Sequence, residues 1–491
     1  MVSRVLFLTL CWLKAGAISP AASPPRPSAE LPFPRLETRP GSLVLSDDPQ
    51  LRKLVERALD QRPELKAARA RMVAEEQRAP QTQSLPDPVV SLGMQNDGFR
   101  QFQVGRMETS WISIGAAQSM PWFGVRAQRA SVAEVGTRVA ESESDRTRLG
   151  IRAEIELGYL GLIAVRDGLD LLRRLDRLWD YAEGVARVRY ESGDGTQGEW
   201  LRAQLERSRL RRQQIQLKTE EQRRLVVLAR LSGGSADDPT TTVHLVDLAD
   251  PVLPDLRDEI ARAHRDSPEA HRSEWEIQRA ERQLSLSRTS IYPDVTVAGG
   301  LMYRGQLEPM WSANLSFGLP VWSRDRQTHA LSEARARRDS AQAARATVLQ
   351  QWEQTIRERR LRIQAALDSN HLYRSGLLVQ SEASTESALI QYRVGKAPFG
   401  SVLEALTGYV SDMNGFFQSL LDVQQLAIAE RELVFLDAGS STSLASTSGA
   451  GMGAASAMGA SPGAPSTGTS ADSSSSDAGN GSPRTNSMTG M

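Results

Sequence analysis

The chain has 491 residues, 40% of them hydrophobic, and its 59 basic residues balance 59 acidic ones. This composition is enough for two or three folded domains, but it is not that of a helical membrane protein. A formal net charge of zero creates no global field toward nucleic acid or anionic lipid, so we expect no nucleic-acid partner.

The first residues have the order of a secretory signal peptide. A short basic start precedes the apolar run 5–13, and small residues follow at Ala15 and Ala17. This run is too short to span a bilayer as a helix, so we expect a signal peptide over 1–17. The single cysteine, Cys11, lies inside it. The mature chain is therefore expected to have no disulfide, thiolate metal site or cysteine nucleophile.

Three segments have the composition of connections or tails. Residues 18–48 are rich in proline and predict an extended tether, and residues 235–253 predict a linker between two halves. Residues 438–491 consist mainly of Ser, Gly and Ala. Such a segment cannot offset the entropy cost of ordering, so we expect it to be disordered.

Between these segments, two repeats are expected, at 49–234 and 254–437. Each predicts a helix, a β-hairpin, a very long helix, a turn and a final helix. The first long helix, from Val125 to about Arg189, contains no proline and has apolar residues at steps of three and four. The second is expected from Arg324 to Gln391. Shorter helices are expected at about 50–80, 197–232, 254–289 and 400–436.

The two expected hairpins, at about 86–121 and 293–320, have the alternating pattern of strands. In 311–319, apolar residues occupy one face and small polar residues the other. This period fits either a half-buried soluble sheet or the wall of a membrane barrel. Aromatic residues near the strand ends favour the membrane, because such residues form interfacial girdles. They are Trp111, Trp122, Phe123, Trp311 and Trp322.

Four strands are too few to close a barrel, and lipid does not tolerate an open sheet edge. If the strands lie in a membrane, several chains must therefore share one barrel.

The turn after each long helix occurs twice. From Tyr190 the chain reads YESGDGTQGEWLRAQ, and from Tyr392 it reads YRVGKAPFGSVLEAL. Matching Pro-Glu, Pro-Asp and strand-exit landmarks, each about 200 residues apart, indicate an internal duplication. Gly193 and Gly395 are expected at a helical tip, where glycine can end a helix and permit reversal.

With these landmarks in order, the chain resembles the outer-membrane efflux proteins of TolC type over about residues 50–436. The Leu-Pro-Asp-Pro sequence at 85–88 and the Pro-Trp-Phe-Gly exit at 121–124 look most like the branch that serves heavy-metal efflux. The resemblance implies a mainly helical homotrimer in the outer membrane, with four strands per chain in a twelve-stranded barrel and a helical barrel in the periplasm. It also implies a passive conduit for small molecules or metal ions. An inner-membrane pump of RND type and a periplasmic adaptor (membrane fusion protein) would be the partners.

The resemblance further implies roles for residues at the tip. Acidic residues after the second turn of the family ring the periplasmic entrance, and the aligned positions are Ser401 and Glu404, with Glu199 in the first half. Only one of the second-half pair is acidic, so a ring of three carboxylates is implied. The alternative is that Glu199 and Glu404 are ordinary acids favoured by a helix N-terminus.

The turn residues Tyr190, Gly193, Tyr392 and Gly395 are candidate adaptor contacts in the same resemblance. The tyrosines could equally be packing residues of the hairpins, since buried tyrosines anchor with an apolar body and a polar tip.

No pattern for catalysis, cofactor or metal binding emerges. His264 and His271 could share a helix face but lack an obvious carboxylate partner, and no P-loop, G-x-S-x-G or H-E-x-x-H sequence occurs. We therefore expect no enzyme activity. Two alternatives to a channel are a secreted, elongated coiled-coil adaptor and a soluble periplasmic binding module. The first would have one helical hairpin, and the second would be a monomer that needs no detergent.

Overall fold

The computed structural model describes residues 41–234, 243–318 and 323–434. The expected signal peptide, most of the proline-rich tether, Trp322 and the tail 438–491 lie outside the described residues. Among the described helices, none combines the length and the apolar character needed to cross a bilayer.

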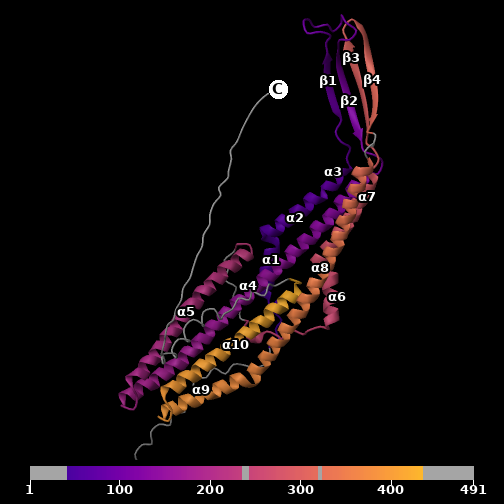
Figure 1. The fold of residues 1–491 in the computed structure, drawn as a ribbon. Coiled ribbons are helices and arrows are strands. Elements are labelled where there is room, and N and C mark those ends of the chain that lie inside the picture. Colours follow the sequence, from indigo (N-terminus) through magenta and orange to yellow (C-terminus); the bar gives the residue numbers. More distant parts are fainter. Residues whose placement is uncertain (1–40, 235–242, 319–322, 435–491) are drawn as a thin grey trace, which may run out of the picture. The chain divides into compact units, whose positions relative to one another are not determined.

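Both halves have the expected order of elements (Figure 1). The first comprises η1 (Leu45–Asp47), α1 (Pro49–Gln61), α2 (Pro63–Glu76), α3 (Arg78–Gln83), β1 (Val89–Gln95), β2 (Trp111–Met120), α4 (Val125–Glu191) and α5 (Gln197–Leu231). The second comprises η2 (Leu245–Asp247), α6 (Leu256–Asp266), α7 (Pro268–Thr289), β3 (Val295–Arg304), β4 (Leu307–Phe317), α8 (Ser323–Leu372), η3 (Tyr373–Leu377), α9 (Leu378–Arg393) and α10 (Phe399–Arg431).

The first helical segment of each half is divided at a proline, which corrects the single helices expected at 50–80 and 254–289. Pro63 begins α2 and Pro268 begins α7, each at the first helical position. Proline fits there because its missing N–H would have no intrahelical partner. Ser267 caps α7 by accepting a hydrogen bond from the Ala270 amide at 3.2 Å.

The two long helices differ in continuity. Helix α4 runs unbroken for 67 residues, or about 100 Å at the usual rise per residue. The second long helix was expected to be continuous, but a five-residue π-helical turn, η3, separates α8 from α9. At this turn the phenol of Tyr373 fills the position that a side chain on Gly415 of α10 would occupy. The π turn therefore places the Tyr373 ring against α10 at a residue that has no side chain.

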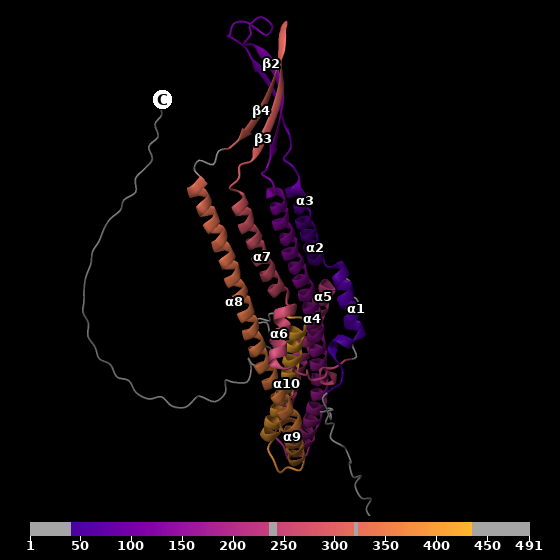
Figure 2. The same ribbon diagram turned by 90° about the vertical axis from the view of Figure 1, so that its right-hand side faces the viewer.

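Helix α4 is the central packing element of the helical region. It contacts α5, α7, α2 and α10, and the views in Figures 1 and 2 agree that α5 and α10 run along it. The main apolar core includes Ile155, Tyr159 and Leu175 of α4 and Phe416 of α10, all almost fully buried. A smaller cluster around Trp352 joins α6 to α8. The core therefore connects the two halves.

The ends of the expected tether and linker are packed structure. Leu43 and Leu248 form a parallel bridge, and the Leu43 amide donates to Asp247 at 3.2 Å. Leu45 and Leu245 are both buried in the main core. These contacts correct the expectation of a free tether up to residue 48 and of a plain linker over 235–253, because apolar residues in both segments join the core.

The four strands form one antiparallel sheet in the order β1-β2-β3-β4. Its two hairpin loops meet where Gly105 and Gly305 approach closely, with φ of 90° and 65°. Arg304 also donates to the carbonyl oxygen of Glu108 at 2.8 Å. A side chain on either glycine would be strained at these φ values, so glycine permits this approach.

The register separates the sheet into two faces of different chemistry. Residues directly opposite one another share a face, so Leu92, Ile114, Leu301 and Trp311 lie in one row. All four are exposed large apolar residues. The other face carries mainly small or polar residues, among them Ser91, Ser113, Gly115, Gly300, Ser312 and Asn314.

Candidate functional site

Two tight turns form the helical tip. Helix α4 ends at Glu191 and α9 at Arg393, and the glycines that follow, Gly193 and Gly395, have φ of 83° and 75°. Glycine is favoured at both positions because other residues rarely adopt positive φ. Both reversals of the chain therefore depend on a glycine with positive φ just after the helix end.

Arg189 ties the first hairpin to the second. Its guanidinium donates to the carbonyl oxygen of Tyr392 at 2.6 Å and lies 4.6 Å from the centre of the Tyr392 ring. The same side chain donates to the carbonyl oxygen of Asp194 at 3.0 Å. A cation over an aromatic face adds a favourable electrostatic contact to these hydrogen bonds.

Tyr392 is fully buried and completes the tie from the other side. Its phenol donates to Glu199 Oε2 at 3.0 Å. Its ring makes an edge-to-face contact with the ring of Phe399, with the two ring centroids 5.4 Å apart. Burial and the neighbouring Glu199 carboxylate raise the pKa of Tyr392 above its ordinary value. The phenol therefore keeps its proton and remains a donor through the neutral pH range.

Tyr190, the sequence counterpart of Tyr392, has a different environment. Its side chain is 41% exposed, and its ring stacks on that of Trp200 with the two ring centroids 5.9 Å apart. The duplicated turn therefore places one tyrosine inside the tip and the other on its surface.

The three candidate entrance residues occupy different positions. Glu404 is exposed on α10, while Ser401 lies in the first turn of that helix and donates to the Pro398 carbonyl oxygen at 2.8 Å. Glu199 lies in the first turn of α5, and Thr196 caps its amide. The Glu199 carboxylate accepts a hydrogen bond from the Tyr392 phenol, so it already has a partner within the chain.

The aromatic residues near the strand ends divide between two environments. Trp122 stacks on Tyr292 at 5.1 Å, and its amide donates to Asp294 at 3.2 Å, which joins the two halves where strands meet helices. Phe123 beside it is 89% exposed. Trp311 lies on the apolar face of the sheet, whereas Trp111, opposite Gln95, lies on the face with small residues. The interfacial role of these aromatic residues stays a prediction.

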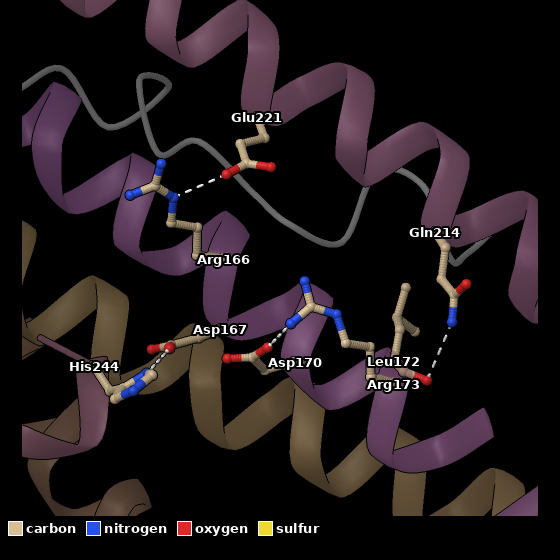
Figure 3. A network of polar contacts seen from close by, with 8 residues as sticks. All are labelled: Arg166, Asp167, Asp170, Leu172, Arg173, Gln214, Glu221 and His244. Carbon is tan, nitrogen blue, oxygen red and sulfur yellow. Dashed lines mark hydrogen bonds and ion pairs between the residues drawn. The ribbon is translucent and has the colours of Figure 1, made fainter. Parts of the chain in front are cut away.

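A polar cluster that no sequence pattern predicted lies where the linker meets α4. His244 Nδ1 lies 2.5 Å from Asp167 Oδ1, and the Leu245 amide donates to Asp167 Oδ2 at 2.7 Å. Figure 3 shows Asp170, one turn further along α4, beside this pair. Burial raises the pKa of Asp167, and the hydrogen bond to Asp167 raises the pKa of His244.

No sequence signal pointed to this cluster, since 77 positions separate Asp167 from His244. The only available hint was a histidine in a segment whose composition indicated a linker.

The sequence profile of the outer membrane efflux protein family matches residues 54–234 and 260–438 of this chain. The chain belongs to the outer membrane efflux protein family. The profile thus matches the chain over two successive ranges. No curated protein sequence matches the chain at a significant level.

Solved structures of outer-membrane proteins and channels have a similar fold. VceC from Vibrio cholerae is 19% identical, with a TM-score of 0.65, over 78% of this chain and 96% of that one. The open state of MtrE from Neisseria gonorrhoeae is 16% identical, with a TM-score of 0.65, over 82% and 94%. CusC is 13% identical, with a TM-score of 0.65, over 85% and 99%. The TM-scores establish the likeness of the fold, and identities this low show no more than that.

Membership of the efflux protein family confirms the predicted fold class and function. The efflux protein is a channel of the outer membrane, its helical part is periplasmic, and it is not an enzyme. An elongated coiled-coil adaptor would have one helical hairpin. Within residues 41–434 where the structure is described, there are two, α4–α5 and α9–α10, and each follows a pair of strands in the chain.

Proposed function

We propose that three copies of this efflux protein form one continuous conduit, in which each chain gives four strands to a twelve-stranded barrel in the outer-membrane lipid. The observation that carries this proposal is the sheet itself. Strands β1 and β4 are its edges, and an unpaired edge is not tolerated in lipid. Pairing β4 of one chain with β1 of the next removes every edge.

The chemistry of the two sheet faces supports this arrangement. Leu92, Leu301 and Leu315 are each more than half exposed on the apolar face, and β1 and β2 carry no charged side chain. An outward apolar band and an inward polar face are the pattern of outer-membrane barrels. The small polar residues of the other face would then line the channel.

Exposed apolar stripes on the helices support a second level of association. Four residues on α5 repeat at near-helical intervals on one face, and two further pairs, one on α8 and one on α9, are each spaced about three helical turns apart. They are Leu201, Leu205, Ile215 and Val226 on α5, and Leu361, Leu372, Val379 and Ile390 on α8 and α9. In a trimer, the stripe of one chain would pack against the other stripe of its neighbour.

The tip is the proposed periplasmic entrance and adaptor-binding end. Tyr190 and the turns at Gly193 and Gly395 are its exposed features, whereas Tyr392 holds the two hairpins together. A periplasmic adaptor would contact the exposed turns, and an inner-membrane pump, which we propose to be of RND type, would deliver the substrate. The conduit supplies no energy of its own.

Glu404 is the residue that we propose for the constriction. Its carboxylate is exposed near the start of α10, while Ser401 hydrogen-bonds to the backbone and Glu199 to Tyr392. One carboxylate from each of three chains would favour cations in a narrow entrance. Glu199 would act on the closed state through Tyr392 and not as a member of the ring.

We also propose that the protein belongs to the heavy-metal branch of the family. The support is the Leu-Pro-Asp-Pro sequence at 85–88 and the Pro-Trp-Phe-Gly exit at 121–124. Gly124, the last residue of the exit, has φ of 84° and caps the start of α4, so this short sequence has a defined backbone role. The equal TM-scores to VceC, MtrE and CusC do not rank the branches.

Planar-bilayer conductance of Glu404→Gln trimers tests the proposed entrance. The variant should lose a substantial part of its cation selectivity at low salt, because three carboxylates are neutralised and no bulk is added. Glu386→Gln, an exposed acid on α9, is the matched control and should behave like the wild type. Equal selectivity in all three proteins would contradict the constriction, whereas failure of the wild type to form pores would contradict the conduit.

A further inference from the structure

The cluster of Asp167, Asp170 and His244 has the arrangement of a metal site. Asp167 and Asp170 are three residues apart on α4, so both side chains project from one side of the helix. His244 approaches from the linker, where it caps η2. Figure 3 shows the three side chains together at this junction.

The distances suit a shared ligand. One donor atom from each of the three residues lies within 4.8 Å of the other two. An imidazole and two carboxylates are a donor set that zinc and similar divalent transition metals accept. Moving each donor by an ångström or so would bring all three to about 2 Å from a central ion.

Both carboxylates also have a second contact that would orient them. The Leu245 amide holds Asp167 Oδ2 at 2.7 Å, and Arg173 pairs with Asp170 Oδ1. Metal-binding carboxylates are commonly held by such outer hydrogen bonds, which leave their other oxygen for the ion. Arg166 is paired with Glu221 at 2.8 Å. Arg166 is therefore neutralised by a carboxylate outside the three proposed ligands, whereas Arg173 shares the charge of Asp170 itself.

The site has room and access. A cavity of about 200 Å³ is lined by the same three residues together with Arg166, Arg173 and Glu221. The side chain of His244 is 51% exposed, whereas that of Asp167 is 5% exposed. An ion could therefore enter past the histidine and keep water as a further ligand, with a buried carboxylate as its inner anchor.

We propose that Asp167, Asp170 and His244 bind one divalent transition-metal ion of the zinc class, which fixes the segment between the two repeats to α4. The bound ion would hold η2 next to the bridge between Leu43 and Leu248, where the segment before the first half meets the start of the second. This role is structural and independent of the substrate that the channel conducts.

Zinc titration of the full-length trimer in detergent tests this proposal. The protein carries a non-histidine tag, is treated with EDTA, and is then titrated with ZnCl₂ against a chromophoric chelator. We expect one zinc per chain. Loss of an outer-shell contact costs about 10- to 100-fold in metal affinity. Each variant removes a ligand, so His244→Ala should weaken binding by about a hundredfold or more and Asp170→Asn by about tenfold or more. His271→Ala removes an exposed histidine elsewhere and should bind like the wild type.

A second readout separates a metal site from a merely structural contact. Cobalt should give a visible absorption band in the wild type that is absent from His244→Ala, and zinc should raise the melting temperature only where the site is intact. If His244→Ala fails to fold, Asp170→Asn supplies the comparison. No zinc binding by the wild type, or equal binding by the wild type and the ligand variants, would overturn the proposal and leave a histidine–aspartate ion pair.

Discussion

Tyr392 donates a hydrogen bond to Glu199 at 3.0 Å, although 193 positions separate the two residues. The bond joins the last turn of α9 to the first turn of α5, so it connects the two helical hairpins at the tip. Any motion that separates the hairpins must break this bond and the nearby contact between Arg189 and Tyr392. The tie therefore resists separation of the two hairpins.

Tyr392→Phe should raise the open probability of the channel. A hydrogen bond to a charged group contributes about 1.5–3 kcal/mol, which corresponds to a roughly ten- to hundredfold shift toward the open state. Single-trimer conductance in planar bilayers measures this shift. Tyr190→Phe is the control, because Tyr190 stacks on Trp200 at the surface. An unchanged Tyr392→Phe channel would show that the bond does not hold the tip closed.

Leu92→Arg should prevent stable insertion of the barrel. Leu92 is the middle residue of β1, lies on the apolar face and is 80% exposed. An arginine facing lipid near the bilayer centre costs about 2–4 kcal/mol per chain. Ser91→Arg, its neighbour on the opposite face, should insert and only alter conductance. Outer-membrane yield of trimer measures both, and equal yields would contradict the assignment of the two faces.

Gly415→Ala should destabilise the helical region. The added methyl group would collide with the Tyr373 phenol, and such overpacking costs about 1–3 kcal/mol. Gly408→Ala on the same helix meets no atom within 4 Å, and it should stabilise by about 0.5–1 kcal/mol through helix propensity. Thermal melts of the detergent-extracted proteins should therefore shift in opposite directions. A Gly415→Ala melting temperature at or above that of the wild type would show that the π turn tolerates the methyl group.

Asp422→Asn should stabilise the protein at neutral pH. Burial raises the pKa of Asp422 above its ordinary value of 3.8, although Gln418 donates to it. Because the pKa in the folded state lies above that in the unfolded state, the protonated carboxyl contributes its full stabilisation below the unfolded-state pKa. This stabilisation is lost as the pH rises through the folded-state pKa. The asparagine variant avoids this loss, so its advantage in melting temperature should be absent at pH near 3 and appear toward pH 7. A lower melting temperature of Asp422→Asn at pH 7 would indicate that a cation stabilises the carboxylate in the assembled protein.

Much of the fold could be predicted because it depends on short-range periodicity and on a repeat. The alternation in 311–319 correctly assigned Trp311 and Leu315 to the apolar face. The proline-free stretch before Arg189 likewise predicted α4. The helix starts at Pro63 and Pro268 could also have been predicted, because proline favours the first position of a helix. The expected helices at 50–80 and 254–289 did not take this preference into account.

Features that depend on distant contacts could not be predicted from the sequence. The π turn at Tyr373 depends on the space beside Gly415, and the burial of Tyr392 but not Tyr190 depends on how the hairpins pack. The cluster of Asp167 and His244 arises because an expected linker folds onto α4. In each case the partner lies far along the chain, where a local pattern carries no information.

The most direct test of the shared barrel is the mass and location of the native protein. Cells expressing the full chain would be fractionated, and the detergent-extracted protein measured by size exclusion with light scattering. We predict that the protein is found in the outer-membrane fraction, with a protein mass three times that of one chain. A water-soluble monomer in the periplasmic fraction would contradict the account.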